Sequence, residues 1–189
     1  MLQVQAGERP TIEPWEIGEV VAINPVPFHL SVIQDVSASM TARDAKAAQL
    51  VWALRQGLSV LKGASLTHVA FGTTARVVEP TPRIEKFKSA ENTAVFPHAV
   101  RLAAEHRAHQ RGVEASATVI VSDGDFPTGA RAAATRACAE LTHAEGRIFW
   151  VDGSEPDSQP SGVTFVSLNK PFACAASILE QSLFGSESS

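Results

Sequence analysis

The chain is poor in cysteine, in basic runs and in long apolar runs, and each scarcity excludes a class of protein. It holds only two cysteines, Cys138 and Cys174, in separate alanine-rich segments, which predicts buried thiols rather than a disulfide or a metal pair. A net charge of -4 without a long basic run argues against nucleic acid as the main partner. Because no apolar run is long enough to span a membrane and residues 1–27 lack a secretory pattern, we expect no membrane partner. We expect a cytoplasmic protein, or part of a particle assembled in the cytoplasm.

The remaining composition predicts one α/β domain with extensions at both ends. With 44% hydrophobic and 19% charged residues, the 189-residue chain can bury a core of ordinary size. We expect an N-terminal arm over residues 1–27, a folded domain over residues 28–184 and a disordered tail over residues 185–189. The arm contains four prolines and no clear helical period, so we expect it to pack outside the central sheet.

Strand-like and helix-like segments alternate along the domain. Apolar runs predict strands over residues 28–33, 65–71, 75–78, 117–121 and 147–151, the second and third joined as a hairpin. Apolar residues at helical spacing predict helices over residues 41–61, 95–110, 129–144 and 171–184. A further apolar segment, residues 163–168, precedes the last helix. This alternation indicates a three-layer, doubly wound α/β fold whose sheet is mostly parallel, with one antiparallel edge hairpin strand.

The start and the end of the first helix have sequence signals of their own. Thr41 and Asp44 resemble a capping box, in which Asp44 substitutes for the usual Glu or Gln. Gly63 is predicted to stop the same helix.

The most informative motif follows the first predicted strand. Asp35, Ser37 and Ser39 form the pattern D-x-S-x-S at the edge where open α/β sheets bind ligands. Carboxylate and hydroxyl oxygens suit Mg²⁺, Mn²⁺ or Ca²⁺ and suit zinc or copper poorly. Taken alone, such residues are also common in turns and at helix N-caps.

A second carboxylate follows another predicted strand. The sequence Ser122-Asp123-Gly124 ends the strand over residues 117–121, which predicts that Asp35 and Asp123 lie at neighbouring strand ends. Together with Met40 after the first motif, this arrangement resembles von Willebrand factor A (vWA) domains that carry a metal-ion-dependent adhesion site. The resemblance covers roughly residues 28–184 and implies a Rossmann-like fold with bound Mg²⁺, or alternatively Mn²⁺ or Ca²⁺.

The resemblance also implies a set of metal ligands. Ser37 and Ser39 would bind the metal through their hydroxyls, Asp35 directly or through water, and Asp123 through water. The threonine that the family uses on a third loop corresponds to Thr93. Because the segment over residues 91–97 is bulkier than the family pattern and one residue longer, two alternatives to this threonine stay open, Asn92 and Ser89.

Other chemistries fit the sequence less well. Haloacid-dehalogenase-type phosphatases need D-x-D after the first strand, and Ser37 occupies the second of these positions. The sequence contains neither a G-x-S-x-G elbow nor a phosphate-binding P-loop. His106 and His109 are three residues apart on a predicted helix and could bind a metal. Beside Arg107 and Arg111, however, they are more typical of a solvated face.

A cation held mainly by neutral hydroxyls keeps much of its charge and an open coordination position. This favours capture of an acidic side chain over activation of water, which would need a nearby general base. We therefore expect a non-enzymatic protein-interaction module whose partner supplies an Asp or Glu to the metal. The vWA resemblance implies partners such as MoxR-type AAA+ ATPases.

A second hypothesis for the function is a structural subunit of a larger assembly, such as a phage or secretion particle, with the N-terminal arm making contacts. The third is a Mg²⁺-dependent hydrolase.

Overall fold

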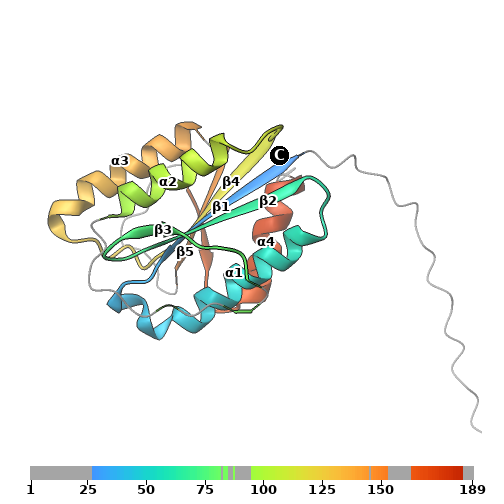
Figure 1. Ribbon diagram of the computed structural model, residues 1–189. Helices are drawn as coiled ribbons and strands as arrows, with labels where there is room; N and C mark the ends of the chain where they lie inside the picture. The colour runs from blue at the N-terminus through green and yellow to red at the C-terminus, as the bar shows by residue number, and fades with distance from the viewer. Residues whose placement is uncertain are drawn as a thin grey trace, which may run out of the picture.

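Among the described residues, six strands form one sheet with β1 and β4 at its centre (Figure 1). The strand order is β3-β2-β1-β4-β5-β6, and every neighbouring pair is parallel except β2 and β3. The strands are β1 (Phe28–Asp35), β2 (Ala64–Phe71), β3 (Ala75–Val77), β4 (Ala115–Val121), β5 (Arg147–Asp152) and β6 (Val163–Ser167). A mostly parallel sheet with an antiparallel edge strand confirms the predicted fold class.

The computed structural model describes residues 27–81, 83–84, 87, 95–144, 146–152 and 163–184. The predicted arm, apart from residue 27, and the predicted tail lie outside these residues, so both stay predictions. The segment that the sequence analysis left unassigned forms β6. This edge strand is only partly buried, which explains why its apolar pattern is weak.

Helices cover both faces of the sheet, as a doubly wound fold requires (Figure 1). The helices are α1 (Asp44–Ser59), α2 (Phe96–Ala108), α3 (Thr128–Ala144) and α4 (Pro171–Phe184). Alternate residues of β1 divide between two cores. Leu30 and Val32 pack with residues of α1 and α4, whereas Ile33 packs with residues of α2 and α3. Burial on both faces explains why the central strands read as continuous apolar runs.

The predicted capping box is wrong. A 3-10 helix, η1 (Ala38–Ala42), lies between the D-x-S-x-S motif and α1, and the Thr41 hydroxyl donates to the carbonyl of Ala38 within it, at 2.7 Å. Helix α1 therefore begins at Asp44, with Arg43 at the N-cap position. The prediction failed because the tight turn after the motif uses the threonine hydroxyl locally. Helix α1 ends at Ser59, before the predicted stop at Gly63.

The two cysteines lie in different cores. Cys138 of α3 packs in the core beneath α2 and α3, and Cys174 of α4 packs in the core beneath α1. Both are buried and neither forms a disulfide, which confirms the prediction.

Among the described residues, no helix has both the length and the apolar character needed to cross a membrane.

Candidate metal centre

The register of the two central strands places the two sequence motifs side by side. Gln34 of β1 pairs with Val121 of β4, so Asp35 and Ser122 follow at neighbouring strand ends. Asp35 is 1% exposed and Ser122 is fully buried. The candidate site thus begins at the carboxyl-terminal edge of the sheet, as the sequence predicted.

Both oxygens of the Asp35 carboxylate accept a hydrogen bond. The backbone N–H of Ser37 donates to Oδ1 at 2.8 Å, and the Ser122 hydroxyl donates to Oδ2 at 2.7 Å. Burial raises the pKa of the Asp35 carboxyl, and the hydrogen bonds from Ser37 and Ser122 partly oppose this rise. The negative charge of Asp123 raises the same pKa further, as expected of two neighbouring carboxylates. A cation at this edge would relieve both the burial of charge and the repulsion.

The hydroxyl oxygens of Ser37 and Ser39 lie 3.0 Å apart. Adjacent ligands of an octahedral Mg²⁺ ion with bonds of about 2.0 to 2.1 Å are separated by about 2.9 Å. The hydroxyl pair therefore has the spacing that two neighbouring ligands of such an ion need. Ser37 is buried and Ser39 is exposed, so the pair runs from the protein interior to the solvent.

Asp123 follows β4 and forms an ion pair that the sequence analysis did not foresee. Arg43 Nη1 donates to Asp123 Oδ2 at 3.3 Å, and the Asp125 backbone N–H donates to Oδ1 at 3.2 Å. The chain turns at Gly124 with a φ of 72°, a conformation that L side chains rarely adopt. The carboxylate is thereby held between the start of α1 and its own turn.

Ser122 is held by three further contacts. Its backbone N–H donates to the Val151 carbonyl at 3.2 Å, and its carbonyl accepts from Trp150 Nε1 at 2.9 Å. Its hydroxyl oxygen also accepts from the Gly124 N–H at 3.1 Å. The hydroxyl that supports Asp35 is therefore fixed in place by β5 and by the turn. The sequence does hold a signal for this role, because Ser122 is a hydroxyl residue directly before the strand-terminal Asp123. The predicted ligand set did not include Ser122.

Three of the predicted ligands come together through the contacts above: Asp35, Ser37 and Ser39. Asp123 lies on the neighbouring strand end, close enough to affect the pKa of Asp35. Thr93 lies outside the described residues, as do its two alternatives, Asn92 and Ser89. Within the described part of the chain, no three His, Cys, Asp or Glu side chains are grouped to hold a metal ion.

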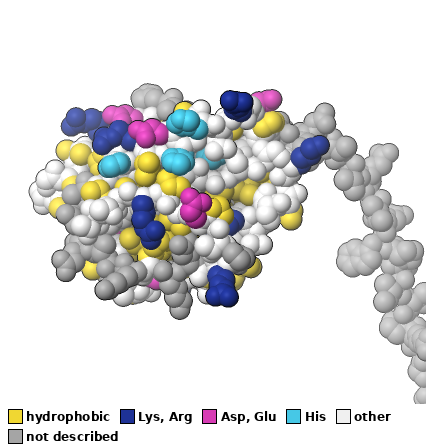
Figure 2. All heavy atoms as spheres, in the orientation of Figure 1, with side chains coloured by type: hydrophobic (Ala, Val, Ile, Leu, Met, Phe, Trp, Pro, Cys, Tyr) yellow, Lys and Arg dark blue, Asp and Glu magenta, His cyan; other side chains and the backbone are white. Residues whose placement is uncertain are grey.

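The two histidines at the C-terminal end of α2 are solvated, as predicted. His106 and His109 are exposed, and His109 Nδ1 lies 2.6 Å from the carbonyl oxygen of Glu105. Figure 2 shows histidine, acidic and basic side chains mixed on the surface over α2.

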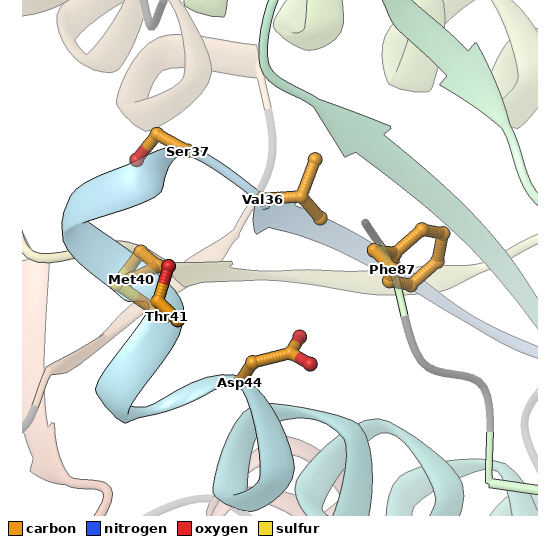
Figure 3. A pocket seen from close by; sticks show the side chains of 6 residues that line it. All are labelled: Val36, Ser37, Met40, Thr41, Asp44 and Phe87. Carbon is orange, nitrogen blue, oxygen red and sulfur yellow. The ribbon is translucent and has the colours of Figure 1, made fainter. Parts of the chain in front are cut away.

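A cavity of about 200 Å³ opens beside the motif (Figure 3). Figure 3 shows Met40 and Thr41 of η1 on one side of it and Phe87 across from them. The lining side chains are those of Val36, Ser37, Met40, Thr41, Asp44 and Phe87. Ser37 thus belongs both to the hydroxyl pair and to the wall of this cavity.

Comparison with known proteins supports the fold class alone. No family model matches the chain, and no curated protein matches it. An aerotolerance-related membrane protein from Bacteroides fragilis is similar with a TM-score of 0.54 and 16% identity, over 82% of this chain and 98% of that one. The manganese-loaded TRAP protein of Plasmodium vivax has a TM-score of 0.55 and 13% identity, over 79% of this chain and 72% of that one. A mutant of the PilB minor pilin from Streptococcus sanguinis has a TM-score of 0.60 and 10% identity, over 83% and 61%.

At these identities the likeness concerns the backbone alone. The chain has the vWA-type, Rossmann-like α/β fold, with a mostly parallel sheet between two helical layers.

Proposed function

We propose that this protein is a non-enzymatic interaction module that binds an acidic residue of a partner protein through a Mg²⁺-type ion. Asp35, Ser37, Ser39, Thr93 and Asp123 would hold the ion, and Mn²⁺ or Ca²⁺ could replace Mg²⁺. The observation that carries the proposal is the hydroxyl pair at 3.0 Å, supported from below by a buried carboxylate whose two oxygens are both oriented.

Three of these side chains, Asp35, Ser37 and Ser39, have separate tasks in the proposal. Ser37 and Ser39 supply neutral oxygens, so the cation keeps charge for the partner's carboxylate. Asp35 is held rigidly by its two hydrogen bonds and balances part of that charge from the interior. Ser39 is exposed, which leaves the outer side of the pair accessible to a partner. When bound, the ion supplies positive charge and an open coordination position.

The contact partner of Asp123 and the comparisons both bear on the proposal. The side chain that contacts Asp123 Oδ2 is the guanidinium of Arg43, which is a hydrogen-bond donor with no acceptor and offers no general base. The fold is also shared with a manganese-loaded structure, the TRAP protein of Plasmodium vivax, which supports a divalent ion in this fold.

The chemistry of the site favours a partner protein that presents Asp or Glu. The resemblance to vWA domains adds a MoxR-type AAA+ ATPase or a subunit of a larger assembly as the partner that we propose, and we propose a cytoplasmic location for the complex. A second candidate function is a structural subunit of such an assembly. The likeness of the fold to a minor pilin supports this second candidate.

Calorimetric titration with Mn²⁺ tests the proposal. We expect binding by the wild-type protein and a loss of about tenfold or more in affinity for Asp35→Asn and for Ser39→Ala. Ser59→Ala is the matched control, because its hydroxyl donates to the Gln56 carbonyl near the end of α1, away from the motif. Failure of the wild-type protein to bind Mn²⁺, or equal losses in Ser39→Ala and Ser59→Ala, would contradict the proposal.

A further inference from the structure

We infer that Arg43 competes with the metal ion for Asp123 and thereby makes metal binding depend on an acidic ligand. This inference rests on the proposed function and adds a residue that determines the specificity of the site. The guanidinium is predicted to weaken the binding of the bare cation and to strengthen the binding of the carboxylate that follows.

The geometry places a permanent positive charge at the site. Arg43 Nη1 lies 3.3 Å from Asp123 Oδ2, and the side chains are 28% and 8% exposed. The ion pair joins the start of α1 to the end of β4, eighty positions apart in the sequence. Because Asp123 is nearly buried, solvent and salt screen this pair less than they screen a surface pair.

The formal charges show how Arg43 divides the two binding steps. Arg43 makes the formal charge around Asp35 and Asp123 one unit more positive, both before and after a divalent ion binds. Since Coulomb energy scales with the product of the charges, Arg43 opposes the first step and favours the second.

The side chain of Arg43 can be changed without removing a capping hydrogen bond of α1. Arg43 occupies the N-cap position of α1, but within the described part of the chain its side chain makes no capping hydrogen bond. Asp123 keeps the hydrogen bond from the Asp125 N–H to its other oxygen when the guanidinium is removed. The variant Arg43→Gln therefore removes the charge and leaves the carboxylate oriented, whereas Arg43→Lys retains the charge.

Two titrations on three proteins test the inference. Mn²⁺ is titrated into the wild-type protein, Arg43→Gln and Arg43→Lys, and acetate is then titrated into each Mn²⁺-loaded protein. We expect Arg43→Gln to bind Mn²⁺ about tenfold more tightly and acetate several-fold more weakly than the wild type. Arg43→Lys should stay close to the wild type in both titrations. A purely structural ion pair would change both affinities in the same direction.

The outcomes separate this inference from the proposed function. If the wild-type protein binds Mn²⁺ and Arg43→Gln binds it equally or more weakly, the inference is wrong and the proposed function stands. If neither the wild type nor Arg43→Gln binds Mn²⁺, both are wrong. If only Arg43→Gln binds Mn²⁺, Arg43 does compete with the ion, but the proposed function of the wild-type protein is wrong.

Discussion

The hydroxyl of Ser122 donates a 2.7 Å hydrogen bond to Oδ2 of Asp35 and so connects the ends of the two central strands. Asp35 accepts its other hydrogen bond from its own loop, at the N–H of Ser37. The Ser122 carbonyl in turn accepts from Trp150 of β5. The carboxylate at the base of the candidate site is therefore positioned by three neighbouring strands.

Replacement of Ser122 by Ala should destabilise the protein. The change leaves one oxygen of a buried carboxylate without its donor, which costs about 1 to 3 kcal/mol in the free energy of unfolding. We expect a similar change in Mn²⁺ affinity, about tenfold weaker, because the carboxylate loses its orientation. Urea unfolding and calorimetry measure the two effects. Ser122→Thr retains the hydroxyl and is the control; if Ser122→Thr loses as much as Ser122→Ala, the hydrogen bond is not the cause.

Gly124→Ala should weaken metal binding, whereas Gly112→Ala should not. Both glycines have a positive φ, of 72° and 74°, so an alanine at either position costs about 1 to 2 kcal/mol of stability. Gly124 lies in the turn that carries Asp123, and Gly112 lies beyond α2 with open space around it. Thermal unfolding should show similar losses for both variants, and Mn²⁺ titration should separate them. Equal Mn²⁺ affinities for the two variants would argue against a role for this turn.

Two buried histidines predict a loss of stability in mild acid. Burial lowers the pKa of His68 to about 3 and that of His29 to about 4, and nearby arginines add to both shifts. Between these values and the unfolded value of 6.5, the unfolded chain binds more protons than the folded protein. The free energy of unfolding should therefore fall as the pH is lowered through this window. His68 Nδ1 has no hydrogen-bond partner among the described residues, so a proton there would be unsatisfied.

The variant His68→Gln isolates one histidine from the other titrating groups. Asp35 acts in the opposite direction, because burial raises the pKa of its carboxyl and the folded protein then binds the extra proton. Comparison of His68→Gln with the wild type at each pH cancels that contribution. Urea unfolding between pH 4.5 and 6 should show a slope about 1.4 kcal/mol per pH unit smaller in the variant. Identical slopes in the two proteins would show that His68 does not titrate as the burial implies.

The two thiols should be unreactive in the folded protein. Burial raises the pKa of Cys138 to about 11 and that of Cys174 to about 12, so little thiolate forms at neutral pH. We expect no reaction with Ellman's reagent in native buffer and reaction of both thiols in urea. Fast modification of either thiol in native buffer, or a disulfide found by mass analysis, would contradict the buried placement.

The sequence alone was enough to predict five of the six strands, the helices that alternate with them and the close approach of Asp35, Ser37 and Ser39. These features depend on periodicity and on neighbours two residues apart, which local chain geometry keeps together whatever the rest of the chain does. It also placed the two aspartate motifs at adjacent strand ends, because parallel strands share one carboxyl edge. The capping box at Thr41 failed for a related reason, since two local hydrogen-bonding patterns compete for one hydroxyl.

The contacts that support the candidate site and set its charge depend on the assembled fold. The contacts between Ser122 and Asp35 and between Arg43 and Asp123 join residues 87 and 80 positions apart. Such pairs depend on strand order, on register and on the residue at which α1 begins, and no local pattern specifies these three together. The contact of the Ser122 hydroxyl with Asp35 and that of the Arg43 guanidinium with Asp123 therefore could not be predicted from the sequence. Both contacts form only when the sheet and α1 have assembled.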